Sequence, residues 1–199
     1  MKILVSGVQF PLEPLSKGGY QMDLIQVILL TGLMLFLVLI LSFLRKPKVY
    51  TFKKEQFVSS DMDTVFDFFS RPENLEKITP PAMGFHIMTP KPVEMKAGAI
   101  IDYTVNIMGI PARWRTMITA YKKNEFFVDE QLKGPYSYWH HKHSFEAVEG
   151  GINIVDEITY ALPLEAFRSI VHPLFIKPQL RKIFSFRFQI IQDNFNHKK

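Results

Sequence analysis

The sequence contains no cysteine, which excludes a disulfide framework, a thiolate metal site and a cysteine nucleophile. It also lacks a Gly-rich phosphate loop, a Gly-x-Ser-x-Gly elbow, a His-Glu-x-x-His motif and a dinucleotide-binding fingerprint. Nicotinamide-dependent, ATP-dependent and serine-hydrolase chemistry are therefore without their usual sequence signals. Tryptophan is scarce, with two residues against eighteen phenylalanines, and this ratio predicts an interior built from large apolar rings.

A general excess of positive charge is also missing, although the formal net charge is +5. Residues 1–54 hold seven basic and two acidic residues, whereas residues 55–199 hold 17 of each sign. Because proteins bind phosphate backbones through clustered Lys and Arg, no nucleic-acid partner is expected. The length of 199 residues, with 47% hydrophobic and 22% charged residues, fits one ordinary domain plus an appendage.

The appendage is a run of 21 residues without a charge, residues 24–44. As a helix this run is about 30 Å long, which is the hydrocarbon thickness of a bilayer. The alternatives are a buried core helix, which rarely runs this far without a polar face, and a signal peptide, which has a shorter apolar stretch and a cleavage site of small residues. The run is followed instead by Arg45-Lys46-Pro47-Lys48, so the sequence predicts a transmembrane helix.

The basic residues on either side of this helix predict its orientation. Five lie between Arg45 and Lys54, and two precede the apolar run. The positive-inside rule therefore places the C-terminal body in the cytoplasm. Residues 1–23 are expected to be a flexible segment, and residues 45–54 to be a basic juxtamembrane segment that runs into the first strand. The bilayer is thus an expected partner through residues 24–44.

Short alternating segments separated by turn residues follow Pro47 and predict a sheet. The predicted strands cover residues 49–58, 85–89, 99–108, 112–122, 126–133, 136–148 and 152–162. A short helix capped by Ser60 or Asp61 follows the first strand, and a second is predicted over residues 73–78. Short connections favour antiparallel neighbours.

After Pro163 the apolar spacing changes to that of a helix. One stripe has steps of four, four, three and four: Leu180, Phe184, Phe188, Ile191 and Phe195. Pro173 and Pro178 predict a kink or a separate turn before a firm helix from about residue 178. The fold class predicted is α+β, a curved antiparallel sheet of about seven strands around a long C-terminal helix, with a cavity between them.

Three runs of the body resemble the START-like SRPBCC superfamily, the START/Bet v 1-like proteins: NLEKITPP at 74–81, GIPARWRTMI at 109–118 and FVDEQLKGPYSYWHHKHSF at 127–145. The body, residues 49–196, is similar more narrowly to bacterial ligand-binding proteins labelled cyclase/dehydrase-like. The resemblance implies a helix-grip fold with an interior cavity for lipids, polyketides, steroids or other apolar molecules. The resemblance predicts a cavity but does not identify its ligand, since such folds serve carriers, cyclases and regulators. The N-terminal anchor departs from the usual soluble members.

Strand alternation sorts the polar residues of the body onto faces. Trp139, His141 and His143 share one face, so Asp129 and Asp156 on their own apolar faces are expected companions of the two histidines. The candidate ligand-binding residues are Tyr103, Trp114, Asp129, Gln131, Trp139, His141, His143, Tyr160 and Arg187. Arg187 interrupts the apolar stripe of the last helix and is expected to pair with an acid or to cap the cavity.

The His–Asp cluster has three interpretations. It is a buried hydrogen-bonded network that fixes sheet register, a set of cavity groups that orient a ligand, or a catalytic group. In the catalytic case His141 or His143 is a general base oriented by Asp129 or Asp156, suited to an aldol-type cyclisation or a dehydration. A His-x-His metal site is a further possibility, but two ligands are too few and the carboxylates are unplaced in the sequence. We therefore predict no metal and no cofactor.

These expectations combine into one hypothesis. The protein is a single-pass protein of the bacterial inner (plasma) membrane whose cytoplasmic body binds a small hydrophobic or amphipathic ligand, such as a lipid, quinone-like or polyketide-like molecule. The alternatives are a cyclase or dehydratase that uses the His–Asp cluster, and a protein-interaction or regulatory module. The sequence identifies neither the ligand nor a protein partner.

Overall fold

The computed structural model describes residues 22–44, 47–163 and 167–196. The chain divides into two compact units, residues 1–39 and 40–199. Most of the predicted N-terminal segment, and Arg45 and Lys46 of the predicted basic segment, lie outside the described residues.

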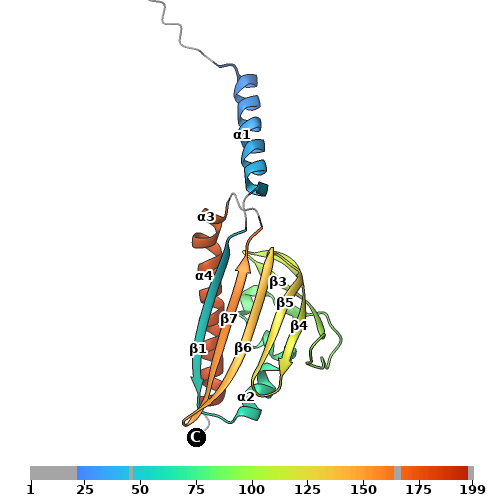
Figure 1. The fold of residues 1–199 in the computed structure, drawn as a ribbon, viewed down its shortest axis with the longest axis vertical. Helices are drawn as coiled ribbons and strands as arrows, with labels where there is room; N and C mark the ends of the chain where they lie inside the picture. Colours follow the sequence, from blue (N-terminus) through green and yellow to red (C-terminus); the bar gives the residue numbers. More distant parts are fainter. Residues whose placement is uncertain (1–21, 45–46, 164–166, 197–199) are drawn as a thin grey trace, which may run out of the picture. The chain divides into compact units, whose positions relative to one another are not determined.

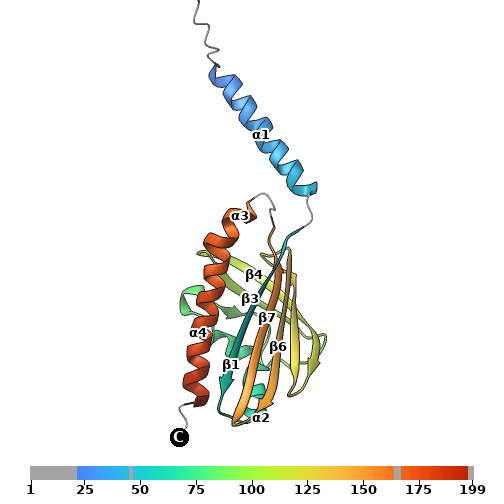
Figure 2. The same ribbon diagram turned by 60° about the vertical axis from the view of Figure 1, so that its left-hand side comes forward.

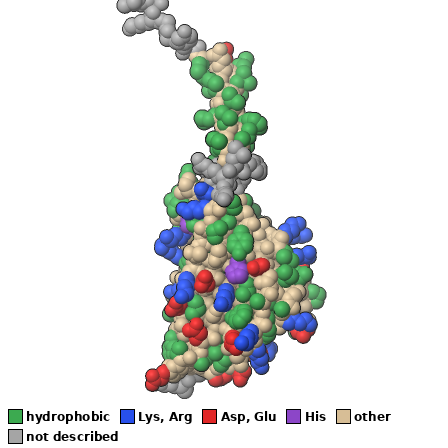
Figure 3. Space-filling model, in the orientation of Figure 1, with side chains coloured by type: hydrophobic (Ala, Val, Ile, Leu, Met, Phe, Trp, Pro, Cys, Tyr) green, Lys and Arg blue, Asp and Glu red, His purple; other side chains and the backbone are tan. Residues whose placement is uncertain are grey.

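Helix α1, Leu24–Leu44, accounts for the predicted apolar run. Its first turn is fixed by a reciprocal cap, in which the amide of Gln26 donates to Asp23 Oδ1 at 2.7 Å and the amide of Asp23 donates to Gln26 Oε1 at 3.2 Å. Among the described residues it is the one helix long and apolar enough to cross a membrane, and none of its apolar window is buried. Apolar side chains cover it in the space-filling view, whereas charges of both signs are spread over the body (Figure 3). It is therefore not a core helix, while an anchor and a signal sequence share these features.

The body is built on one antiparallel sheet of seven strands in the order β1-β7-β6-β5-β4-β3-β2. The strands are β1 Val49–Val58, β2 His86–Ile87, β3 Ile100–Ile107, β4 Ile110–Lys122, β5 Phe126–Lys133, β6 Tyr138–Val148 and β7 Gly151–Ala161. The sheet curves, and helix α4, Lys177–Asn196, lies along it (Figures 1 and 2). The predicted fold class is confirmed, because the strands form one curved sheet that packs against a long C-terminal helix.

The two short elements after β1 differ in how closely they follow the prediction. Helix α2, Met62–Phe69, begins at Asp61, whose carboxylate accepts the amide of Thr64 at 2.9 Å. The predicted second helix is instead a 3₁₀ turn, η1 Pro72–Glu76, followed by another, η2 Pro81–Met83. The predicted strand over residues 85–89 shrinks to β2, because the amides of Met88 and Thr89 both donate to the carbonyl of Asp102 and end the regular ladder.

The start of the C-terminal helix confirms the predicted kink. A short helix α3, Arg168–Val171, passes into a π-helical turn η3, His172–Ile176, before α4 begins. Pro178 has no amide to donate, and a widened turn just before it is a common response to that loss.

One side of α4 is buried against the sheet, and it departs from the predicted stripe. The buried residues of α4 are Leu180, Phe184, Arg187, Ile191 and Phe195. Phe188 is only half-buried, and the amino group of Lys54 lies 5.0 Å from its ring centroid. The stripe therefore passes through a charged residue at its centre, which brings Arg187 into the interior.

A substitution of Phe66 tests how strongly helix α2 packs against the buried aromatic residues of the sheet. It is buried and lies edge-on to the rings of Tyr121, Phe127 and Phe145, with centroid distances of 5.6, 6.2 and 5.1 Å. We expect Phe66→Ala to lower the free energy of unfolding by about 3–5 kcal/mol, measured by urea titration of the full chain in detergent micelles. Val148→Ala at an exposed position of β6 is the control and should change it little. A loss below about 1 kcal/mol for Phe66→Ala would contradict this packing.

Candidate functional site

The body encloses a mainly apolar cavity of about 140 Å³ between the sheet, η1, η2 and α4. An engineered cavity of about 150 Å³ is known to hold a benzene molecule, so this space matches one ring or a short apolar segment. Its walls come from alternate residues of the strands, such as Ile101, Tyr103, Val105 and Ile107 of β3. Leu180, Ile183 and Phe184 of α4 close the opposite side.

Seven of the nine predicted ligand-binding residues line this cavity: Tyr103, Trp114, Asp129, Trp139, His141, His143 and Arg187. Gln131 does not, because its amide nitrogen donates to the carbonyl of Tyr136 at 2.7 Å and holds the turn between β5 and β6. Tyr160 does not either, and its hydroxyl lies 2.9 Å from His172 Nε2. Alternation places both side chains on the inner face, but it cannot say how far along that face the cavity extends.

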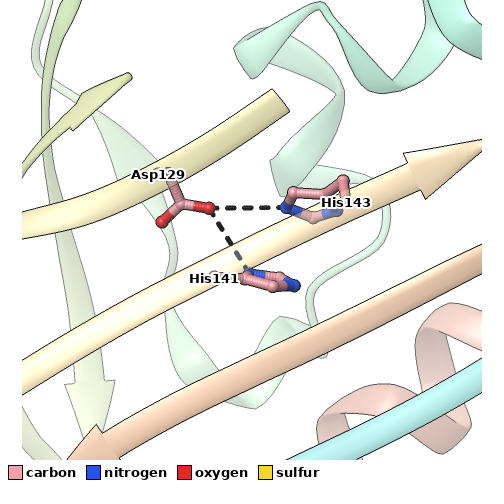
Figure 4. A group of neighbouring side chains, drawn as sticks. All are labelled: Asp129, His141 and His143. Atoms are coloured by element: carbon pink, nitrogen blue, oxygen red, sulfur yellow. Dashed lines mark ion pairs between the residues drawn. The ribbon is translucent and has the colours of Figure 1, made fainter. Parts of the chain in front are cut away.

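The cavity's polar wall is a cluster from three adjacent strands, which we call the His–Asp cluster: Asp129, His141, His143 and Asp156. Register brings it together, since β5 pairs Asp129 with His141 and β7 pairs Asp156 with His143. Asp156 lies on one side of the two rings, with its Oδ1 3.0 Å from His141 Nε2 and 2.7 Å from His143 Nδ1. Asp129 lies on the other side, with its Oδ2 3.4 Å from His141 Nδ1 and 3.4 Å from His143 Nε2 (Figure 4).

Arg187 brings a positive charge to the same place. Its Nη1 lies 3.8 Å from Asp156 Oδ1, and its guanidinium lies over the ring of Phe184 at 4.7 Å. The side chain is 9% exposed, so it has left water almost completely. A buried guanidinium beside a buried carboxylate is tolerated because each compensates the other's charge.

The ionisation of the His–Asp cluster follows from burial opposed by these neighbours. Burial acts to raise the pKa of Asp156 and of Asp129, but the histidines and Arg187 outweigh it and lower the pKa of both, that of Asp156 strongly. Burial acts to lower the pKa of both histidines. For His143 the two carboxylates outweigh burial, so its pKa is raised. For His141 burial and the electrostatic effect of His143 outweigh the carboxylates, so its pKa is lowered. The two carboxylates therefore favour their ionised forms beside Arg187 and the two imidazoles.

Several buried donors at the cavity make no hydrogen bond with any described residue. They are Trp114 Nε1, the Nε and Nη1 of Arg187, and His143 Nδ1, which lies 2.7 Å from Asp156 Oδ1 without a hydrogen bond. A buried N–H group without an acceptor costs free energy, so donors of this kind at a cavity wall favour a guest that brings an oxygen acceptor. The position of Trp114 was predicted from alternation, whereas the unpaired donors depend on three-dimensional packing.

The sequence reasoning missed a second hollow beside the first. A groove of about 340 Å³ lies between η2, the β3–β4 turn and the segment from η3 into α4. It shares Met83, Gln179 and Ile183 with the cavity, so these residues form the boundary between the two spaces. Leu174, Phe175 and Met108 line the groove as exposed apolar residues, a feature that periodicity alone does not indicate.

Comparison with known proteins identifies the class of fold. No family model and no curated protein matches the sequence. Among solved structures, protein Ms6760 of Mycobacterium smegmatis is 17% identical with a TM-score of 0.54, over 72% of this chain and 88% of that one. Major latex-like protein 151 of Panax ginseng is 13% identical with a TM-score of 0.55, over 74% and 97%.

A third similar structure is a norcoclaurine synthase variant of Thalictrum flavum in complex with a transition-state analogue. It is 15% identical with a TM-score of 0.55, over 75% of this chain and 98% of that one. The body therefore has the helix-grip fold of Bet v 1-like and START-like SRPBCC proteins, as its sequence motifs indicate. At these identities the likeness defines the fold, and the function has to be argued from the site.

Substitutions of Asp156 and Arg187 test whether the charges of these two buried side chains compensate each other. We expect Asp156→Asn or Arg187→Met alone to lower the free energy of unfolding by about 3–5 kcal/mol, because each leaves the other charge buried without its partner. The double variant should cost at least about 1 kcal/mol less than the sum of the two, as measured by urea unfolding of the full chain.

Asp102→Asn provides the control, because it breaks the exposed pair in which Arg115 Nε lies 2.8 Å from Asp102 Oδ1. It should change stability far less than Asp156→Asn. Strict additivity of the Asp156 and Arg187 substitutions would show that the two charges do not compensate each other.

Proposed function

We propose that the protein binds a small amphipathic molecule whose ring or short apolar segment fills the cavity and whose oxygen acceptor faces Trp114 and Arg187. The observation that carries the proposal is an apolar cavity lined by buried, unpaired donors, Trp114 Nε1 from β4 and Arg187 from α4. Ligand pockets have this character, since apolar walls supply affinity and a few polar groups fix orientation. The helix-grip fold is consistent with the binding of hydrophobic ligands.

The ligand source follows from the N-terminal helix. α1 anchors the protein in the bacterial inner (plasma) membrane as a single span, and the excess of basic residues after it keeps the body in the cytoplasm. A tethered body meets membrane molecules at a high effective concentration. Quinone-like, lipid-like and polyketide-like molecules all combine an apolar part with oxygen acceptors, and a quinone-like ring suits a cavity of about 140 Å³.

The neighbouring groove provides room for the rest of such a molecule. Its volume of about 340 Å³ and its exposed residues Leu174 and Phe175 suit an apolar tail that continues past Ile183. Burial of the tail there stabilises the complex by about 25 cal/mol per Å² of apolar surface removed from water. The ring would then lie inside and the tail outside, in the groove.

A second candidate function is catalysis, since His141, His143 and Asp129 line the cavity. In a cyclase or dehydratase a histidine accepts a proton from the bound molecule, and Asp129 or Asp156 orients its ring. A molecule that is bound to the purified chain can be released by denaturation and incubated with fresh protein. This incubation separates the two candidate functions. An unchanged mass and retention time indicate binding alone, whereas a product that has lost water or closed a ring indicates the enzyme.

Tryptophan fluorescence gives a direct test of the cavity. The chain has two tryptophans, Trp114 and Trp139, and both line the cavity, so quenching by a brominated or quinone probe reports entry there. We expect saturable quenching of the full chain in lipid nanodiscs by a short-tailed quinone. Val105→Phe should weaken the affinity about tenfold or more. The added ring takes up space that the guest would fill, and crowding of this kind costs the complex about 1–3 kcal/mol of binding free energy.

Ile100→Phe is the matched control, since it makes an enlargement on the same strand at a position that faces solvent. It should leave the affinity within about twofold of the parent, because exposed substitutions change free energies by about 0.5 kcal/mol or less. Equal quenching in the parent, Val105→Phe and Ile100→Phe proteins would contradict cavity binding.

A further inference from the structure

The inner side of the His–Asp cluster has the layout of a metal centre. Asp129, His141 and His143 each offer one ligand atom, a carboxylate oxygen or a ring nitrogen, and these three atoms lie within 4.8 Å of one another on two neighbouring strands. The carboxylate oxygen is 3.4 Å from each ring nitrogen, and both contacts meet at the same atom (Figure 4). The sequence had left this carboxylate unplaced, and the register of β5 against β6 supplies it.

These distances differ from those of an ordinary His–carboxylate contact on the same strands. One residue along, on the opposite face, His140 Nδ1 lies 2.7 Å from Glu130 Oε1, which is a short hydrogen bond. The inner pairs are separated by 3.4 Å, beyond the usual range for a hydrogen bond. Ligands about 2.0–2.1 Å from a tetrahedral zinc ion lie about 3.3–3.4 Å apart, so the two separations between the Asp129 oxygen and the ring nitrogens match the edges of such a site.

The outer nitrogens of the same rings complete the arrangement. His141 Nε2 and His143 Nδ1 lie 3.0 and 2.7 Å from Asp156 Oδ1, so one carboxylate contacts both rings at the nitrogens turned away from Asp129. A metal-bound histidine usually has a carboxylate or carbonyl at its second nitrogen, which sets the tautomer and the direction of the ring. Asp156 occupies this position for His141 through a hydrogen bond, and for His143 it lies close to the second nitrogen without a hydrogen bond in this geometry.

We propose that Asp129, His141 and His143 bind a divalent first-row transition metal, with geometry best matched to Zn²⁺, and that Asp156 positions the two imidazoles. Two histidines and one carboxylate are a known donor set for catalytic zinc and for non-haem iron(II). All three residues line the cavity, so the remaining coordination position faces a guest molecule.

A bound metal also changes the charge of the cavity wall. With neutral imidazoles, a divalent ion and Arg187 outweigh Asp129 and Asp156 by one positive charge. An anionic or carbonyl oxygen of the guest can take the open coordination position beside this excess. The metal site thus goes beyond the proposed ligand binding, since an apolar guest can occupy the cavity without the metal and the metal can bind without a guest.

The test uses tag-free full chain in lipid nanodiscs, stripped with a chelator and titrated with Zn²⁺ and with Co²⁺. We expect one equivalent of Zn²⁺ to bind and to raise the unfolding temperature, and Co²⁺ to give the intense visible absorption of a four-coordinate site. Asp129→Asn and His143→Asn should each weaken Zn²⁺ binding by about 100-fold or more, and Asp156→Asn by about 10–100-fold.

The matched control is the double variant Glu130→Gln with His140→Asn, which removes the His–acid pair of the outer face and leaves the inner one. It should bind Zn²⁺ as the parent does. Binding that is lost in this control but kept in Asp129→Asn and His143→Asn would overturn the proposal, as would a parent chain without saturable Zn²⁺ binding.

Variants that fail to fold do not weaken the test, because the parent chain can be examined directly. X-ray absorption of the Zn²⁺-loaded parent should show a first shell of nitrogen and oxygen with two imidazoles. A shell with one imidazole or none would overturn the proposal. Quinone quenching of the metal-free parent is measured separately, so a failure of the metal site and a failure of ligand binding are distinguishable.

Discussion

The structure of the body depends on the compensation of charge in an apolar interior. Asp129, Asp156 and Arg187 are ionised groups removed from water, together with the imidazoles of His141 and His143. An isolated charge in this position would be prohibitively unfavourable, so the strands that carry these groups must keep one register. A slip of one residue would turn every side chain of a strand to the other face and leave the partners without compensation.

This constraint explains how a cavity can persist beside a packed core. Two apolar clusters hold the ends of the body: one around Phe66 and Ile191, and one around Ile158 and Phe184. Between them the stripe of α4 contributes Arg187 in place of an apolar side chain. Its charge is drawn to Asp156 on the sheet, and the space beside this contact belongs to the cavity. The same polar wall offers donors to a guest and, through Asp129 and the histidines, ligands to a metal.

Much of this architecture follows from patterns that act over a few residues. Alternation and turn residues predict the seven strands, and the faces of His141, His143, Asp129 and Asp156 are correct because period-two geometry leaves no other choice. The START-like motifs predict the helix-grip fold, and the solved structures confirm it.

The remaining features depend on distances between elements, which no local pattern encodes. Apolar spacing favours Phe188 in the buried stripe, yet the rotation of α4 buries Arg187. Alternation also cannot show that Gln131 bonds to the turn at Tyr136 or that Tyr160 contacts His172 outside the cavity. The spacing of 3.4 Å around Asp129 likewise appears only once β5 and β6 are paired.

The proposed function requires that the cavity hold a molecule with an apolar part and an oxygen acceptor. Native mass spectrometry of the full chain released from lipid nanodiscs, followed by mass analysis of whatever dissociates on activation, tests it most directly. We expect one additional organic molecule per chain, with a ring or short apolar segment and at least one oxygen acceptor, and its loss in Val105→Phe. A chain that carries no molecule under conditions that preserve other lipid complexes, or a purely hydrocarbon guest, would show that the cavity does not bind an amphipathic molecule.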